Sequence, residues 1–291
     1  MNTPLQKLGL TAAQFGLDQP AGPRGRSPQA EAREILAIAA RARLSVLEVG
    51  HGFAHSESAL GAVLPRPQPF KMCITAARCD RGPDHVEAEA RNSLRRLGVE
   101  RAYGIIVNAP SDLFSPQGAA AWHRLQTLRD AGLFERIGIS AHATDDPVGL
   151  TRRFRPDIVQ APASLLDQRL LADGSLARVA GMQVEVHLRS IFLNSLLFLP
   201  PDRAPGPMKD AANKLSRVRR MIAEGRSDPL QAAIGFALSR QEGDCVLVGV
   251  TSAAELNAVV AAAASPPPDL DWDEMAIDDP AALDARRWVA A

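Results

Sequence analysis

The 291-residue chain has few cysteines, no net charge and no long apolar run. Its three cysteines are too few and too scattered for a disulfide framework, and no C-x-x-C metal spacing occurs. Equal numbers of acidic and basic residues remove the electrostatic case for nucleic acid or an anionic membrane as a partner. No run of about 18 uncharged apolar residues occurs, and the N-terminal sequence MNTPLQKLGL lacks the apolar segment of an export signal. We therefore expect a globular, cytoplasmic protein.

Short β-rich segments alternate with amphipathic segments along most of the chain. The expected strands are Lys7–Ala12, Ser45–Val49, Phe70–Thr75, Tyr103–Asn108, Arg136–Ser140, Asp157–Gln160, Val184–Ser190 and Cys245–Val250. The expected helices are Pro28–Arg43, Ser56–Leu64, Pro83–Leu97, Gln117–Ala131, Asp146–Phe154, Leu170–Ala180, Asn213–Ala223, Pro229–Arg240 and Ala253–Ala264. Parallel strands need crossover connections, and eight such units in about 250 residues match the size of a closed barrel. We predict an α/β fold, a single-domain (β/α)8 TIM barrel over residues 1–291.

Two proline-rich segments interrupt this alternation. The segment LPPDRAPGP, ending at Pro207, is irregular and long enough to cover a site. The tail at 265–291 begins SPPPDLDWDEMAIDDP, and we expect it to pack across the barrel exterior as an irregular strap. An open doubly wound sheet is the alternative fold, but no G-x-G-x-x-G follows the first strand.

The functional site of such a barrel forms where the strands end. The residues expected there are Thr11, Ala12, Glu48, Ala76, Asn108, Ser140, Gln160, Arg189, Ser190, Gly249, Val250 and Thr251. Few of these side chains transfer a proton near neutral pH. Arg189 is the one strand-end cation in this set, and it favours an anionic ligand.

Seven segments, in order, resemble the aldo-keto reductase superfamily over nearly the whole chain. They are LGLTAAQFG, VLEVGHGFAHSESALG, SLRRLGVE, WHRLQTLRDAGLFERIGIS, PDIVQAPASLLDQRLL, VHLRSIFLNSLL and VLVGVTSAAEL. The resemblance implies a barrel that binds NADPH, sometimes NADH, in extended form and reduces aldehydes or ketones.

The resemblance also locates the catalytic tetrad of the family, and all four positions are substituted. Members carry Asp-Thr-Ala-x-x-Tyr-Gly-x-x-Glu, in which the tyrosine donates the proton; here the aspartate position is Glu48 and the tyrosine position is Phe53. The lysine that lowers the tyrosine pKa is replaced by Ala76, and the histidine that orients the carbonyl by Asn108. Carbonyl reduction needs a proton, which a phenyl ring cannot supply. The single tyrosine, Tyr103, opens a strand and is expected at the opposite end of the barrel.

The cofactor positions that the resemblance implies are only partly retained. The candidate cofactor-binding residues are Ser140, Gln160, Arg189, Ser190, Gly249 and Thr251. Ser140 and Gln160 match residues that hold the nicotinamide amide. Thr11-Ala12 replaces the usual Gly-Thr, and Glu255 stands where an arginine often holds the adenosine phosphate, which an acidic group would repel. NADPH or NADH is therefore a candidate cofactor with weak binding.

Two histidines in the loop after the second strand are candidates for a replacement function. His51 and His55 lie beside Glu48 and Glu57, which allows a substitute acid or a metal site. Their spacing falls partly in a loop, so ordinary polar loop residues are favoured and no metal is predicted. Glu48 is either a general base or a structural carboxylate bonded to loop amides or to Arg189.

The favoured function is a family member with a degenerate tetrad that binds a small ligand or a nicotinamide nucleotide at the barrel mouth. It would have little or no ordinary carbonyl reductase activity. The alternatives are an active NAD(P)H-dependent oxidoreductase with non-standard proton delivery, a non-redox lyase or isomerase, and a scaffold that binds a protein partner. Neither nucleic acid nor a membrane is expected as a partner.

Overall fold

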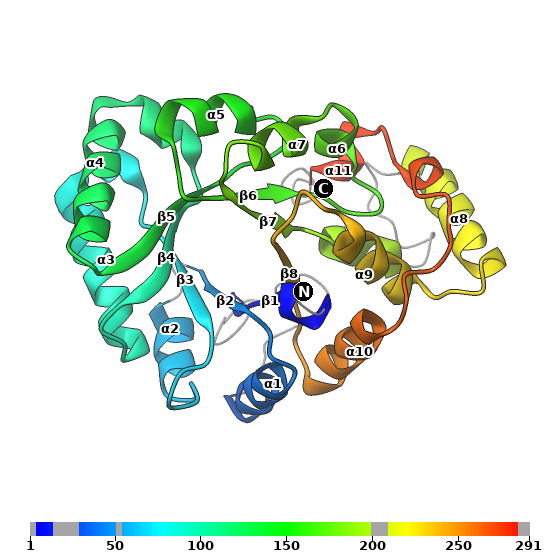
Figure 1. The fold of residues 1–291 in the computed structure, drawn as a ribbon, viewed down its shortest axis with the longest axis horizontal. Coiled ribbons are helices and arrows are strands. Elements are labelled where there is room, and N and C mark those ends of the chain that lie inside the picture. Colours follow the sequence, from blue (N-terminus) through cyan, green and yellow to red (C-terminus); the bar gives the residue numbers. More distant parts are fainter. Residues whose placement is uncertain (1–3, 14–28, 51–53, 199–208, 285–291) are drawn as a thin grey trace.

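Eight parallel strands close into a barrel in chain order (Figure 1). The computed structural model describes residues 4–13, 29–50, 54–198 and 209–284. The strands are β1 (Leu8–Thr11), β2 (Val46–Val49), β3 (Lys71–Thr75), β4 (Ala102–Val107), β5 (Phe134–Ser140), β6 (Ile158–Pro162), β7 (Glu185–Arg189) and β8 (Cys245–Gly249). β8 pairs with β1 and closes the sheet. The predicted single-domain (β/α)8 barrel is confirmed.

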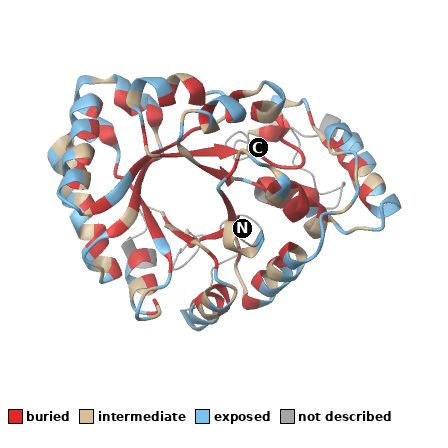
Figure 2. Cartoon of the chain, in the orientation of Figure 1, coloured by how far each residue is buried: buried red, intermediate tan, exposed pale blue. Residues whose placement is uncertain are grey.

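Helices cover the outside of the barrel. The α-helices are α1 (Gln29–Arg41), α2 (Ala54–Gly61), α3 (Pro83–Leu97), α4 (Pro116–Asp130), α5 (Pro147–Phe154), α6 (Arg169–Ala172), α7 (Ser175–Ala180), α8 (Lys209–Glu224), α9 (Pro229–Ser239), α10 (Ala253–Ala264) and α11 (Pro280–Leu283). Short 3-10 helices are η1 (Pro4–Lys7), η3 (Cys79–Arg81), η4 (Pro110–Phe114), η5 (Leu193–Phe198) and η8 (Asp273–Met275). Figure 2 shows buried residues on the strands and on the inner faces of these helices. Within the described ranges, no helix is both long and apolar enough to cross a membrane.

Two helices have the bounds that the sequence predicts, and each has clear terminal signals. α3 starts with Pro83, which lacks the amide hydrogen that a first helical turn leaves unbonded. It ends at Gly98, which adopts the left-handed conformation (φ 67°) that glycine tolerates best. α10 is capped by Ser252, whose side chain accepts a hydrogen bond from the amide of Glu255.

Two predicted helices differ most from the structure in their extent. α8 begins at Lys209 rather than at Asn213, and the second difference is larger. The segment expected as a single helix at Leu170–Ala180 forms two short helices, α6 and α7. Between them Gly174 has a left-handed backbone (φ 72°), and the Asp173 carboxylate accepts a hydrogen bond from the amide of Ser175 at 2.8 Å. The turn-forming pair Asp173-Gly174 outweighs the helical hydrophobic pattern around it.

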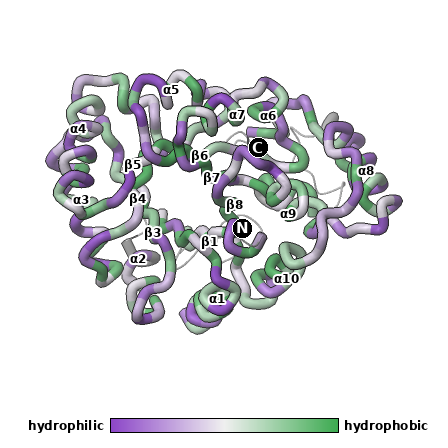
Figure 3. The backbone as a smooth tube through the Cα atoms, in the orientation of Figure 1, coloured by the Kyte–Doolittle hydropathy of each residue, from purple (hydrophilic) through white to green (hydrophobic). Residues whose placement is uncertain are grey.

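The interior of the barrel is filled by small and branched side chains. Figure 3 colours the backbone by hydropathy, and hydrophobic residues occur on the strands. One interior cluster contains Val46, Cys73, Ile106, Ile158, Cys245 and Leu247. A side chain at Gly9 would place its Cβ 2.8 Å from the sulfur of Cys245, so glycine is required there. Cys73 and Cys245 are buried free thiols, as expected for small core residues.

The tail after α10 contacts helices and a loop on one side of the barrel. The amide of Ile277 donates to the carbonyl of Leu166 at 2.9 Å, and the Trp272 ring meets Phe236 of α9 edge-on at 5.7 Å. Asp278 forms an ion pair with Lys214 of α8 at 2.9 Å. These contacts tie the tail to α8, α9 and the loop after β6.

Candidate functional site

The residues expected around the mouth lie at the carboxyl ends of their strands. Glu48 is in β2, Ser140 ends β5, Gln160 is in β6, Arg189 ends β7 and Gly249 ends β8, while Ala76 and Asn108 directly follow β3 and β4. Because all eight strands are parallel, these ends share one opening of the barrel. His51 and Phe53 lie outside the described residues, as does the side chain of His55.

Glu48 and Gln160 contact each other across the mouth. The side-chain amide nitrogen of Gln160 donates a hydrogen bond to the Glu48 carboxylate at 2.8 Å. Gln160 is only 2% exposed. Gln160, which is expected to hold a nicotinamide amide, therefore already donates its side-chain hydrogen bond to the Glu48 carboxylate. A bound nicotinamide would have to compete with that carboxylate for the same donor.

Arg189 turns toward the loop after β5. Its guanidinium donates to the carbonyl of Ala141 at 2.8 Å and to the hydroxyl of Ser190 at 3.2 Å, and it lies 3.3 Å from Nδ1 of His142. Among the described residues no ion pair joins Arg189 to Glu48, whose carboxylate accepts from Gln160.

A cavity of about 230 Å³ lies beside Arg189. Arg169 also lines it, and its Nε and Nη2 donate to the Asp167 carboxylate at 2.8 Å. Leu283 and Asp284 of the tail complete the wall. With two arginines and two aspartates, the lining carries balanced charge. The size suits a small polar group better than a dinucleotide.

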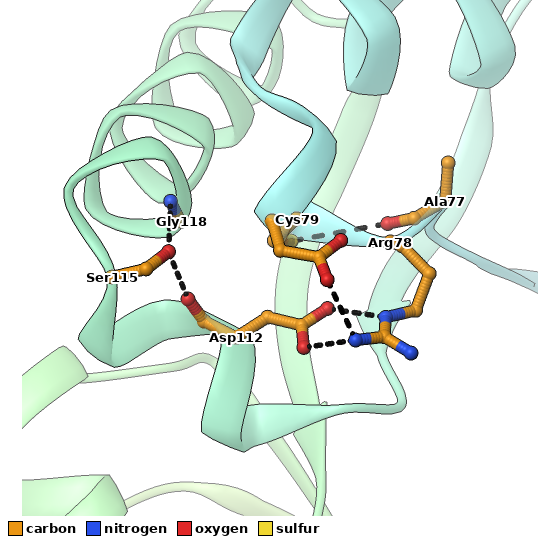
Figure 4. Close-up of polar contacts among 7 residues, drawn as sticks. Ala77, Arg78, Cys79, Asp112, Ser115 and Gly118 are labelled. Atoms are coloured by element: carbon orange, nitrogen blue, oxygen red, sulfur yellow. Dashed lines mark hydrogen bonds and ion pairs between the residues drawn. The ribbon is translucent and has the colours of Figure 1, made fainter.

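The two loops that carry Ala76 and Asn108 are fastened to each other (Figure 4). Arg78, in the loop after β3, makes two 2.7 Å hydrogen bonds to Asp112 of η4, and Asp112 is buried. A bidentate pair of this kind fixes orientation as well as distance. Arg78 adds a cation three residues beyond the end of β3, outside the set of strand-end positions in which Arg189 is the one cation. Asp112 lies 34 positions from Arg78 in the sequence, so no local spacing predicts that the two side chains pair.

Glu57 is committed to the packing of α2 against α3. Its carboxylate, which is 0% exposed, accepts from the Ser93 hydroxyl at 2.6 Å and from Nε of Arg96 at 2.5 Å. The Glu57 carboxylate therefore bonds to α3 and does not take part in the site at the barrel mouth. The described part of the chain contains no group of three His, Cys, Asp or Glu residues that could hold a metal ion.

Tyr103 lies at the opposite end of the barrel, where β4 begins. Its hydroxyl donates to the Glu185 carboxylate, which also bonds Nε2 of the fully buried His187 at 2.9 Å. Burial and the bond to Glu185 raise the pKa of Tyr103. Lys71 lies over the face of the ring, 4.7 Å from its centroid. A tyrosine, a lysine, a histidine and a glutamate therefore meet here, a set that differs from the family tetrad in having glutamate for aspartate, but the phenol keeps its proton and faces away from the mouth.

The surroundings of the loop between β8 and α10 contain the acidic Glu255, in the first turn of α10, and an apolar cavity. The Glu255 carboxylate accepts from the amide of Thr251 at 2.8 Å, so its position is fixed by the chain itself. A cavity of about 360 Å³ beside it is lined mainly by apolar residues, among them Phe192, Phe198 and Val259. No basic residue is among its described lining. This lining offers nothing to neutralise a phosphate.

Comparison with known proteins gives a consistent result. Residues 8–277 match the model of the aldo/keto reductase family. An aldo-keto reductase from Bacillus halodurans, in its holo form, has a similar structure, with 18% identity, 92% of this chain and 89% of that chain covered, and a TM-score of 0.73. A glycerol dehydrogenase from Gluconobacter oxydans is 16% identical, with 92% of this chain and 88% of that chain covered and a TM-score of 0.69. A putative aldo-keto reductase from Pseudomonas aeruginosa is 17% identical, with 89% of each chain covered and a TM-score of 0.66. No curated protein matches the chain.

Proposed function

The chain belongs to the aldo/keto reductase family, and we propose that it binds a small ligand or a nicotinamide nucleotide at the barrel mouth with little or no ordinary carbonyl reductase activity. One observation carries the proposal. The single tyrosine of the chain, Tyr103, lies at the other end of the barrel with its hydroxyl bonded to Glu185. No phenol is left to protonate a carbonyl oxygen at the mouth.

The lost proton donor has a large effect on rate. A positioned general acid contributes typically 10² to 10⁴-fold, or roughly 3 to 5 kcal/mol of barrier. Ala76 cannot lower the pKa of a neighbouring acid as a lysine would, and Asn108 has no imidazole to orient the carbonyl. These groups act as a unit, so their losses do not simply add.

Cofactor binding is expected to be weak for reasons that lie in two loops. Thr11 and Ala12 replace the Gly-Thr that commonly follows β1 in the family, and the fixed Glu255 repels a 2′-phosphate. The amide of Gln160 is engaged by Glu48. We expect NADPH to bind at least about tenfold more weakly than to a member with the usual residues, a difference of about 1.4 kcal/mol.

A fluorescence titration with NADPH and NADH tests this proposal. Glu255→Gln keeps an oxygen that can accept from the Thr251 amide but removes the charge, so it should tighten NADPH binding severalfold and leave NADH unchanged. Tight NADPH binding by the unmodified protein would favour the alternative, an active oxidoreductase with proton delivery through His51 or His55. An equal effect of Glu255→Gln on both nucleotides would contradict the role given to its charge.

The substituted tetrad can be tested by rebuilding it. Phe53→Tyr alone should restore little reduction, because a tyrosine without a nearby cation keeps a pKa near about 10. Phe53→Tyr together with Ala76→Lys and Asn108→His should restore measurable aldehyde reduction if the loops keep the geometry of the family. Full activity from Phe53→Tyr alone would show that the other two positions do not matter.

A further inference from the structure

A third cavity, which has an excess of positive charge, lies on the amino-terminal face of the barrel, opposite the mouth described above. It has a volume of about 420 Å³. Its walls come from the start of β5, the end of α5 with the turn into β6, and the turn between α7 and β7. α5 and α7 lie side by side at the top of Figure 1.

Three arginines line this cavity: Arg136 near the start of β5, Arg152 in the last turn of α5, and Arg155 at its C-cap. All three are exposed. Across the described ranges no carboxylate forms an ion pair with any of them, whereas several other arginines of the protein are paired. The chain as a whole carries equal numbers of acidic and basic residues, so this local excess is a departure from its average.

The one acidic residue in the lining, Asp157, is already neutralised. Its carboxylate accepts from the amide of Ile137 at 2.9 Å and from the guanidinium of Arg129 at 3.2 Å. Gln183, from the turn before β7, adds an amide to the wall. The lining therefore presents the guanidinium groups of Arg152 and Arg155 to this space, with Arg136 at its edge, where it also interacts with the Tyr103 hydroxyl. The carboxylate of Asp157 has other partners.

The attraction of basic residues to a helix C-terminus does not account for this set. The carbonyl end of a helix favours cations in its last turn, which explains Arg152 and Arg153. Arg153, however, stacks on the rings of Phe114 and Phe154, at 4.7 and 5.5 Å from their centroids, and does not line the cavity. Arg136 comes from a strand. Cations from separate elements thus converge on one space.

We propose that this cavity binds a phosphate group carried by a small molecule. Guanidinium groups form paired hydrogen bonds to phosphate oxygens, and a phosphate monoester carries a charge of about −1.5 to −2 near neutral pH, opposite in sign to the surplus of the lining. The volume falls in the range of small-ligand pockets and leaves room for a small organic group beside the phosphate. The site is separate from the mouth and does not depend on the function proposed for it.

Titration of the full-length protein with inorganic phosphate, followed by backbone amide NMR at low ionic strength, tests the proposal. Sodium chloride at matched ionic strength serves as the blank. We expect saturable shifts confined to the end of α5, Asp157 and the Met182–Val184 turn. Arg152→Gln and Arg155→Gln should each weaken binding about tenfold, the effect of one lost charge-assisted contact.

Arg153→Gln is the matched control, because it removes the same charge from the same helix but not from the cavity. It should change phosphate affinity by less than about twofold, the residual field of an exposed charge. Arg136→Gln, on another element, should weaken binding as Arg152→Gln does. Equal weakening by Arg153→Gln, shifts spread over other basic surfaces, or no saturable shift at all would each overturn the proposal.

Discussion

Replacing Glu57 with alanine should destabilise the protein more than any change of an exposed carboxylate. The Glu57 side chain is 0% exposed and links α2 to Ser93 and Arg96 of α3. Truncation leaves the buried Ser93 hydroxyl without its acceptor and Arg96 without its close partner. Removing one member of a buried ion pair costs about 3 to 5 kcal/mol.

The structure places the expected value at the lower end of that range. Arg96 is 24% exposed and has Glu89 at 3.7 Å, so water and a second carboxylate partly compensate. We expect a loss of about 3 kcal/mol for Glu57→Ala. Glu57→Gln keeps the volume and one acceptor, and should lose about 1 to 2 kcal/mol.

Urea unfolding followed by circular dichroism measures both losses. Glu34→Ala, which removes an exposed carboxylate from α1, is the control and should stay within about 0.5 kcal/mol of the unmodified protein. A double-mutant cycle with Arg96→Ala should show coupling of about 1 to 3 kcal/mol. A loss for Glu57→Ala no larger than that of Glu34→Ala would refute the reasoning.

Two further predictions follow from the packing and the charges. Gly118→Ala would place a Cβ 1.9 Å from the carbonyl oxygen of Asp112, so it should lower the thermal midpoint clearly, whereas Gly181→Ala, whose nearest contact is 3.3 Å, should change it little. Although burial opposes it, hydrogen bonds from His187 and Tyr103 lower the pKa of Glu185 to about 2 from 4.5. The stability from this group is present above pH 4.5 and is lost as the pH falls toward 2; unfolding experiments should show that the unmodified protein loses more stability than Glu185→Gln over this window. Equal losses in the two proteins would contradict this assignment.

The strands could be predicted from the sequence because each has its own local signal. β-rich segments bounded by turns identify all eight, with ends that differ from the structure by a few residues at most. The break between α6 and α7 was missed because the hydrophobic pattern continues through Asp173 and Gly174 while the backbone does not. The turn preference of the Asp-Gly pair is the feature of the sequence that indicates the break.

The contacts of the candidate site were harder to predict, because they join distant positions. Glu48 and Gln160 are 112 positions apart, and no spacing rule connects them. Glu57 is a second example. In the alignment that the resemblance implies, it occupies the final glutamate position of the pattern around Phe53, and its carboxylate bonds Ser93 and Arg96 of α3. This carboxylate therefore positions helices, whatever the chemistry of the loop before it.

The most direct measurement is a single-turnover experiment on the unmodified protein. NADPH is mixed with an excess of protein and a reactive aldehyde, and the loss of reduced nucleotide is followed by absorbance, so that weak cofactor binding does not mask the chemical step. Our account predicts no aldehyde-dependent loss above the rate in buffer. Robust reduction that survives replacement of both His51 and His55 by alanine would contradict it, because proton delivery would then come from a group that the proposal does not recognise.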